Sequence, residues 1–256
     1  MPLFDSHNHL QRFDDPARII AEMRETGIAG CVVNGTCEKD WEAVGRLAEE
    51  HPDFVRPAFG LHPWHAAERS AGWLARLEAW LDRFPKASVG EIGLDGWIEG
   101  PSLEEQVEVF LPQLAMARDR KLPVTIHALK AWEPLFEAFK REIPPENFLL
   151  HSFGGSAELV ERLVPMGAWF SFSGYFLQPR KAKALEVFKT VPPERLLLET
   201  DAPEMMPPDE FVSHPLDGMN HPANLAAIAE GMAGSLGTDV ASLMKLTSRN
   251  HSRFFS

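Results

Sequence analysis

Histidine and carboxylate side chains alternate near the start of the chain. Asp5, His7 and His9 occupy every second position of one short segment. On a β-strand this alternation places all three on one face, with the two histidines roughly 6–7 Å apart. Two imidazoles at that separation can converge on a metal ion, whereas the alternative is a polar strand end. The pair therefore indicates a metal site only together with ligands from elsewhere.

Five further segments end in groups that can bind a metal or a proton. These groups are His62, Glu91, His127, His151 and Asp201. A glutamate inside an apolar segment costs free energy to bury without a partner, and a cation satisfies it. If the segments are strands whose carboxyl ends meet at one rim, these residues form a metal-dependent active site.

Short apolar segments alternate with longer amphipathic ones, which predicts strands followed by helices. Apolar residues three and four apart, such as Val107, Phe110 and Leu111, support the helices, and runs such as Phe148-Leu149-Leu150 are typical of buried parallel strands. The predicted strands are Leu3–His7, Gly30–Asn34, Arg56–His62, Ala87–Leu94, Pro123–His127, Phe148–Ser152, Trp169–Ser173 and Leu196–Thr200. The predicted helices are Pro16–Thr26, Trp41–His51, Ala71–Phe84, Leu103–Arg120, Trp132–Arg141, Ala157–Met166, Arg180–Val191, Pro222–Leu236 and Val240–Phe254.

Eight strand–helix pairs in 256 residues predict an α/β fold, a (β/α)₈ TIM barrel with a C-terminal extra helix. We expect residues 1–256 to form a single barrel domain. An open doubly wound sheet is the alternative. It would normally carry a glycine-rich phosphate loop after the first strand, and this sequence has none.

The charge balance excludes one class of function. The net charge is −12, so the surface repels polyanions on average, and a basic DNA-binding module is excluded as the main design. A phosphate substrate remains compatible, because a bound metal reverses the local field.

Two cysteines, Cys31 and Cys37, make no disulfide framework, and no segment is apolar enough for a membrane span or signal peptide. We expect a cytoplasmic location.

Four histidines and two carboxylates exceed one tetrahedral shell, so two divalent ions are expected. His7, His9 and Asp201 would bind one ion, and His127 and His151 would bind the other. Glu91 can bridge them, because a carboxylate has two oxygens. Two ions about 3.5–4 Å apart would share a hydroxide. The residue types suit Zn²⁺, Mg²⁺ and Mn²⁺ alike.

The motifs at the predicted strand ends resemble those of one known family across essentially the whole chain. They are Asp5-Ser6-His7-Asn8-His9, Gly60-Leu61-His62-Pro63, Gly90-Glu91-Ile92-Gly93-Leu94-Asp95, His127, His151-Ser152-Phe153, Glu199-Thr200-Asp201-Ala202-Pro203 and Leu246-Thr247-Ser248-Arg249-Asn250 with Phe254. In this order they are similar to the TatD family of metal-dependent hydrolases and deoxyribonucleases, which are amidohydrolase-like barrels.

The resemblance implies divalent cations and hydrolysis of a phosphodiester, such as single-stranded DNA or nucleotides, by a metal-bridging hydroxide. The implied ligands are the six residues named above. The implied catalytic residues are Asp201, Glu91 and His62. His62 would face the substrate phosphate, and Asp201 would orient or deprotonate the attacking water. Neither a membrane nor an obligate protein partner is inferred.

Three departures from the family pattern alter the expected pocket. The family usually has aromatic residues directly after the Leu-Asp of the fourth strand, whereas here Gly96 comes first and Trp97 follows it. Asn220-His221-Pro222 stands where Asn-Glu-Pro is common. Leu129 followed by Lys130 replaces a common arginine, and lysine is a point charge rather than a bidentate fork. The metal centre is therefore better supported than the nuclease activity.

Two other functions remain open. One is a metal-dependent amide, ester or lactone hydrolase on the same barrel, and the other is a catalytically silent metal-binding protein. The complete ligand set argues against the silent protein. Many binuclear amidohydrolases use a carboxylated lysine on the fourth strand, and this chain has Glu91 there instead, which argues against that class. Glu199 is expected to orient a neighbour, and the loop Glu204–His221 to line the substrate pocket. The roles of His65, Lys130, His214 and His221 stay unassigned.

Overall fold

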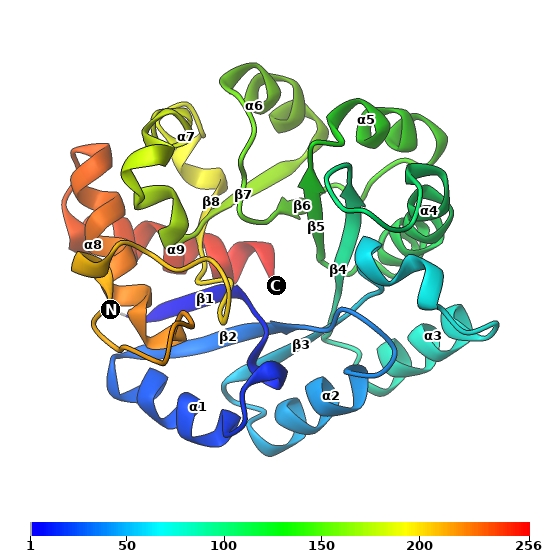
Figure 1. Ribbon diagram of the computed structural model, residues 1–256, viewed down its shortest axis with the longest axis horizontal. Coiled ribbons are helices and arrows are strands. Elements are labelled where there is room, and N and C mark those ends of the chain that lie inside the picture. The colour runs from blue at the N-terminus through cyan, green and yellow to red at the C-terminus, as the bar shows by residue number, and fades with distance from the viewer. Residues whose placement is uncertain (1) are drawn as a thin grey trace. The chain divides into compact units, whose positions relative to one another are not determined.

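Strands alternate with helices along the chain. The computed structural model describes residues 2–256. In that range eight strands form one sheet in the order β1 to β8, and the pairs β3–β4, β4–β5, β5–β6 and β7–β8 are parallel. The strands are β1 (Leu3–Asn8), β2 (Ile28–Asn34), β3 (Val55–Phe59), β4 (Ser88–Asp95), β5 (Val124–Leu129), β6 (Phe148–Leu150), β7 (Ala168–Phe172) and β8 (Leu196–Leu198). The α-helices are α1 (Pro16–Glu25), α2 (Trp41–Glu50), α3 (Trp73–Arg83), α4 (Leu103–Arg120), α5 (Trp132–Arg141), α6 (Ala157–Leu163), α7 (Ala182–Phe188), α8 (Leu225–Leu236) and α9 (Val240–Phe254), as labelled in Figure 1.

Consecutive strands, each followed by a helix, define the (β/α)₈ barrel fold. The predicted fold class is confirmed, and α9 is the extra C-terminal helix. The bounds of α4, α5 and α9 agree with the prediction at both ends. The predicted helix Arg180–Val191 is shorter, because a 3₁₀ turn at Pro179–Lys181 precedes α7.

The contacts divide the chain into two compact units. The central unit contains Val33–His151 and Met166–Ala168, and so holds β3 to β6 with α2 to α5. The terminal unit contains residues 2–32, Ser152–Pro165 and Trp169–Ser256, and so holds β1, β8 and most of β2 and β7, with the remaining helices. Each unit is described by itself below.

In the central unit, α4 fixes the ends of two strands. It begins at a capping box, in which Ser102 Oγ accepts from Glu105 N and Glu105 Oε2 accepts from Ser102 N. Gln106 and Gln113 lie two turns apart on its buried face. Gln113 pairs with both backbone groups of Leu61 at 2.7 and 3.1 Å, and Gln106 pairs with those of Asp95 at 2.7 and 3.0 Å. The segments that follow β3 and end β4 are thereby held beside α4 (Figure 1).

Close backbone approach requires glycine at the carboxyl end of β4. Gly93 pairs with His127 of β5 and has a φ of +148°, and a Cβ there would lie 2.0 Å from the His127 carbonyl oxygen. Gly96 donates its N–H to Leu129 at 2.8 Å. A Cβ at Gly96 would lie 2.4 Å from the Lys130 carbonyl oxygen. Side chains at either position would force β4 and β5 apart.

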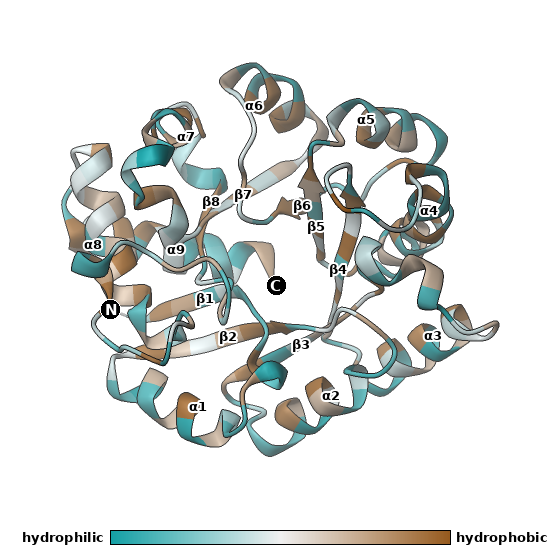
Figure 2. Cartoon of the chain, in the orientation of Figure 1, coloured by the Kyte–Doolittle hydropathy of each residue, from teal (hydrophilic) through white to brown (hydrophobic). Residues whose placement is uncertain are grey.

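Apolar packing stabilises each unit. In the central unit the residues of β6 are fully buried, and Figure 2 shows them as apolar, whereas α5 mixes apolar and polar residues as an amphipathic helix does. In the terminal unit Phe153, Phe170, Phe172, Phe176 and Phe188 form one aromatic cluster, with ring centroids 4.7–6.5 Å apart in the contacting pairs. Such separations are typical of edge-to-face packing.

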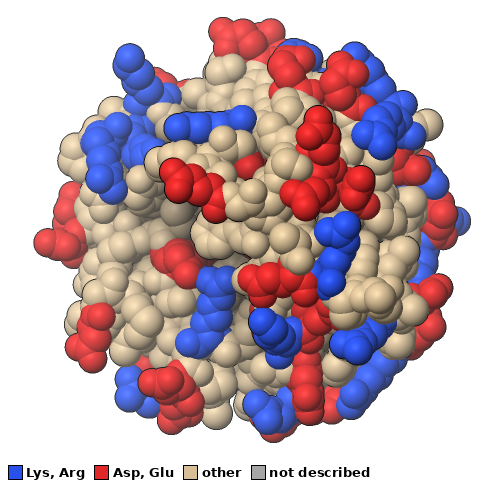
Figure 3. Space-filling view, turned by 45° about the vertical axis from the view of Figure 1, so that its right-hand side comes forward, with Lys and Arg blue, Asp and Glu red and all other residues tan. Residues whose placement is uncertain are grey.

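The surface carries charges of both signs. On the face shown in Figure 3, Lys and Arg side chains lie interspersed with Asp and Glu side chains rather than gathered into a stripe. Among residues 2–256, none of the helices combines the length and apolar character needed to span a bilayer.

Candidate metal centre

The terminal unit brings three predicted ligands together. His7 Nε2 lies 3.3 Å from His9 Nε2, and Asp201 Oδ1 lies 3.4 Å from the first nitrogen and 3.5 Å from the second. In a tetrahedral site with metal–ligand distances of about 2.1 Å, ligand atoms are about 3.4 Å apart. All three residues are buried. Two imidazole nitrogens and a carboxylate oxygen in this triangle fit a divalent cation, and we call them the His7 group.

Asp5 positions the His7 group. Its Oδ1 accepts from Thr200 N at 2.9 Å and from His7 N at 3.3 Å, and its Oδ2 accepts from Thr200 Oγ1 at 2.6 Å and from Asn8 Nδ2 at 2.9 Å. Complete burial raises the pKa of Asp5 to about 6, although these hydrogen bonds act in the opposite direction. Asp5 therefore ties the carboxyl end of β1 to the segment that follows β8.

Asp201 reaches the His7 group from a turn rather than from a strand. β8 ends at Leu198, and Asp201 has a φ of +53°. Its backbone N–H donates to the His7 carbonyl oxygen at 2.9 Å, and His9 N donates to the Ala202 carbonyl at 2.8 Å. These two bonds align the segment 201–202 with the end of β1, so the carboxylate of Asp201 faces the two imidazoles.

The central unit brings three histidines to one carboxylate. Oε1 of Glu91 lies 2.8 Å from His151 Nε2, 3.2 Å from His127 Nδ1 and 3.1 Å from His62 Nε2. His127 Nδ1 and His151 Nε2 are 3.3 Å apart. Glu91 is 3% exposed, so a cation there would compensate an otherwise costly buried charge. We call these four residues the Glu91 group.

His62 belongs to the Glu91 group in the structure, whereas the resemblance placed it against the substrate phosphate. Its Nδ1 accepts the Trp64 backbone N–H at 3.2 Å, which leaves the proton on Nε2, facing Glu91. Burial lowers the pKa of His62 to about 4 despite the nearby glutamate. The sequence indicated that His62 follows a strand, but it did not indicate its contact with Glu91.

Asp95 is a site residue that the sequence reasoning missed as an individual. Its Oδ2 lies 3.0 Å from His127 Nε2 and accepts the indole N–H of Trp64 at 2.8 Å. Its Oδ1 accepts the backbone N–H of Trp97 at 2.8 Å. Burial opposes ionisation of Asp95, but these hydrogen bonds outweigh it and lower its pKa to about 2. Its place at the end of β4, in a motif already quoted, was the available signal.

Three histidines whose roles the sequence left unassigned lie in contacts outside the two groups. His221 Nε2 lies 2.7 Å from Glu22 Oε2 and its Nδ1 accepts from Ala223 N, so it links α1 to the start of α8. His214 packs 5.5 Å from His221, and His65 lies 3.4 Å from Glu68. Lys130 lies over the Trp97 ring.

Glu199 and Asn220 anchor backbone segments of the terminal unit. Glu199 Oε1 accepts from both the N–H and the hydroxyl of Ser152, and its Oε2 accepts from Ser171 Oγ. This agrees with the orienting role expected for Glu199. Asn220 donates to the Thr200 carbonyl at 2.9 Å, which fixes the end of the loop Glu204–His221 beside the turn that carries Asp201.

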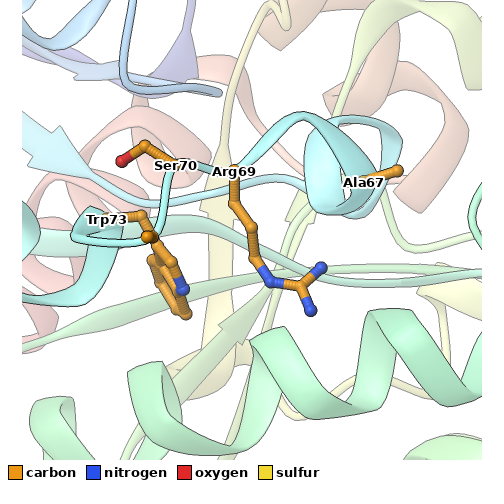
Figure 4. A pocket seen from close by; sticks show the side chains of 5 residues that line it. Ala67, Arg69, Ser70 and Trp73 are labelled. Atoms are coloured by element: carbon orange, nitrogen blue, oxygen red, sulfur yellow. The ribbon is translucent and has the colours of Figure 1, made fainter.

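A cavity of about 380 Å³ in the central unit lies at Ala67, Arg69, Ser70, Ala71 and Trp73. Figure 4 shows the Arg69 and Trp73 side chains projecting to the same side of the loop. Arg69 already donates to the Ala66 carbonyl and to Glu108. None of the predicted site residues lines this cavity, so it adds nothing to the metal-binding groups.

Known proteins resemble the chain over nearly its full length. Residues 4–256 match the family model described as TatD related DNase. The 3'-5' ssDNA/RNA exonuclease TatD of Erwinia tasmaniensis is 32% identical over 94% of each chain. The uncharacterized metal-dependent hydrolase YabD of Bacillus subtilis is 31% identical and covers 99% of this chain and 98% of its own.

A solved structure agrees with these sequence matches. The structure of YJJV, a TatD homolog from Escherichia coli K12, has a TM-score of 0.86 at 28% identity and covers 97% of this chain and 95% of that one. The family match spans the predicted ligands from His7 to Asp201. The chain therefore belongs to the TatD-related DNase family of metal-dependent hydrolases.

Proposed function

We propose that this chain is a divalent-metal-dependent phosphodiesterase that hydrolyses single-stranded nucleic acid or nucleotides. The observation that carries the proposal is the His7 group, in which three ligand atoms from β1 and the segment after β8 face one another 3.3–3.5 Å apart. The Glu91 group repeats that arrangement of imidazole and carboxylate. The exonuclease and hydrolase names of its relatives support the reaction class.

We assign six residues as metal ligands. They are His7, His9, Glu91, His127, His151 and Asp201. The proposed number of ions is two, and Glu91 would supply carboxylate oxygen to them. Divalent ions held by these ligands would stabilise negative charge that develops on a phosphate and would favour ionisation of water.

Asp201 has a second task in this proposal, and two polar residues outside the six ligands support them. Asp201 accepts the proton of the attacking water, because a carboxylate within reach of the reacting atoms acts as a general base. His62 keeps Glu91 oriented through its Nε2–H. Asp95 accepts from Nε2 of His127, which leaves Nδ1 free of a proton to ligate a cation.

Metal content and substrate class test the proposal together. We expect the purified chain to contain up to two divalent ions in elemental analysis, with the anomalous signal at the six ligands. The activity panel contains bis-p-nitrophenyl phosphate, a p-nitrophenyl ester and labelled single-stranded DNA, each with Mg²⁺, Mn²⁺ or Zn²⁺ or after chelation. Metal-dependent cleavage of the phosphodiesters supports the proposal.

Two results would contradict it. Cleavage of the carboxylic ester alone would assign the chain to ester or amide hydrolysis, and binding of metal with no cleavage would identify a silent metal-binding protein. His65→Ala is the matched control variant, because it removes a histidine that contacts Glu68 rather than either group.

A further inference from the structure

Two exposed tryptophans of the central unit are held by one buried carboxylate. Trp64 is 48% exposed and Trp97 is 66% exposed. The indole N–H of Trp64 donates to Oδ2 of Asp95 at 2.8 Å, and the backbone N–H of Trp97 donates to Oδ1 at 2.8 Å. The indole of Trp64 and the backbone that carries Trp97 are therefore fixed at the carboxyl end of β4.

The same carboxylate connects the tryptophans to the Glu91 group. Oδ2 of Asp95 lies 3.0 Å from His127 Nε2. The ring of Trp64 lies 5.0 Å from that of His62 in an edge-to-face contact, and 6.4 Å from that of His127. A molecule bound against these indoles would thus lie beside the proposed metal ligands.

Lys130 adds a positive charge to this surface. Its Nζ lies 4.3 Å over the ring of Trp97, and the second ring face is available because two-thirds of the residue is exposed. The backbone brings this pair together, since Lys130 has a φ of +51° and Gly96 allows its carbonyl oxygen to approach. The segments Gly96-Trp97 and Leu129-Lys130 therefore form one structural feature.

Exposed indoles suit bases that are not paired. Stacking of a base on an aromatic ring contributes to single-strand binding and needs no particular sequence. Because the net charge is −12, the chain does not attract a polyanion at long range. Affinity for a nucleic acid must therefore come from local contacts. A tryptophan that stacks on a base beside a lysine that contacts a phosphate would supply them.

We propose that Trp64, Trp97 and Lys130 form a nucleobase-stacking platform that selects single-stranded oligonucleotides over phosphodiesters that lack bases. The proposal rests on the phosphodiesterase function proposed above. Trp97 stacks on one unpaired base through its open face, Trp64 packs beside His62 and His127 of the Glu91 group, and Lys130 contacts a phosphate of the same strand. The three residues bind substrate and take no part in the proton transfer.

Fluorescence anisotropy with the full chain tests the platform. The probes are a short labelled oligothymidylate with hydrolysis-resistant phosphorothioate linkages and an abasic oligomer of the same length and linkage. We expect the chain to prefer the oligomer with bases. In Trp97→Ala this preference should fall about 5- to 150-fold, the effect of losing one stacked base. Ile143→Ala, which removes an apolar residue 69% exposed, is the control and should keep the preference.

The salt dependence of binding tests Lys130 separately. The slope of log Kd against log salt concentration should decrease by about 0.7 in Lys130→Ala, the amount expected for one lost phosphate contact on a single strand. Lys140→Ala, at an exposed lysine that pairs with Glu137, should keep the slope.

Three outcomes would overturn the platform. They are equal affinity of the chain for the two oligomers, an unchanged preference in Trp97→Ala, and an unchanged salt slope in Lys130→Ala. Selective binding without cleavage of any phosphodiester would contradict the proposed function while supporting the platform. Cleavage without a preference for bases would support the proposed function while contradicting the platform.

Discussion

The two ring nitrogens of His127 face two different carboxylates. Nε2 lies 3.0 Å from Oδ2 of Asp95, and Nδ1 lies 3.2 Å from Oε1 of Glu91. Burial acts to lower the pKa of His127, but its hydrogen bonds to Asp95 and Glu91 outweigh burial and raise it. If a cation takes the place of the Nδ1 proton, donation of Nε2–H to Asp95 would leave Nδ1 as the ligating nitrogen, so Asp95 would set which nitrogen is available as a ligand.

Removing the charge of Asp95 should weaken metal binding without unfolding the chain. Asp95→Asn keeps the shape of the side chain but takes away the anion that orients His127. We expect the affinity for a divalent ion to fall about 10- to 100-fold, as is typical when such a supporting carboxylate is lost. Competition with a chelating dye measures it. Glu108→Gln, at an exposed glutamate, is the control, and an unchanged affinity in Asp95→Asn would contradict the role of Asp95.

Glu91→Gln should lower metal occupancy and activity together. Glu91 supplies the one carboxylate oxygen that His62, His127 and His151 all contact, and an amide cannot offer two anionic oxygens to cations. Elemental analysis of the variant should show loss of at least one ion, and cleavage of bis-p-nitrophenyl phosphate should fall in parallel. Glu137→Gln should retain both. Full occupancy in Glu91→Gln would show that Glu91 is not a metal ligand.

The alternation of apolar segments predicted the fold because it depends on local periodicity. The bounds of α4 agree at both ends, since Ser102 and Glu105 cap its start and the residue after Arg120, Lys121, adopts a left-handed conformation with a φ of +56°. The helix predicted at Arg180–Val191 was too long, because Pro179 begins a separate 3₁₀ turn before α7. A capping box fixed the start of α4, and a local turn shortened α7.

The ends of β6 and β8 depend on partners that are distant in sequence. Both strands were predicted to be longer, through Ser152 and Thr200. The backbone N–H of Ser152 instead donates to Glu199, and that of Thr200 donates to Asp5, which is 195 positions away. Periodicity cannot reveal that a carboxylate takes the place of a strand partner.

The candidate site was predicted in its residue types more fully than in its arrangement. His7 and His9 lie with Asp201 in one group, and Glu91 lies with His127 and His151 in another. The missed contact between Asp95 and His127 arises because β4 and β5 are adjacent and Gly93 lets them approach closely. Sequence spacing places a residue at a strand end but does not select its partner.

Stability should depend on pH through His221. Burial lowers the pKa of His221 below its ordinary value of 6.5, although Glu22 favours the charged form. The unfolded chain therefore binds more protons there than the folded chain does. The contribution of His221 to stability is present above pH 6.5 and is lost as the pH falls toward its lowered pKa.

Unfolding experiments on a variant can isolate this contribution. In His221→Gln, the free energy of unfolding, measured with urea after chelation of metal, should decrease less between pH 8 and pH 5 than it does in the unaltered chain. His65→Gln serves as the control and should follow the unaltered chain. Identical pH dependence in His221→Gln would show that His221 does not titrate differently on folding.

Asp201 provides the sharpest test of how a proton is moved at the site. It lies at a φ of +53° after the end of β8, and its Oδ1 faces the imidazoles of His7 and His9. Asparagine tolerates this left-handed conformation and retains one oxygen that can ligate a cation, so Asp201→Asn should fold normally and keep at least one ion. It cannot accept a proton as a carboxylate does.

We therefore expect kcat for phosphodiester cleavage to fall about 10²- to 10⁴-fold in Asp201→Asn, the usual contribution of a general base. Circular dichroism and elemental analysis would verify the fold and the metal content of the same preparation. Asp209→Asn is the matched control and should keep its kcat, because Asp209 lies in the exposed turn Asp209–Phe211 of the loop Glu204–His221. A near-normal kcat with full metal content would limit Asp201 to a structural role. The proton would then have to be accepted by another group.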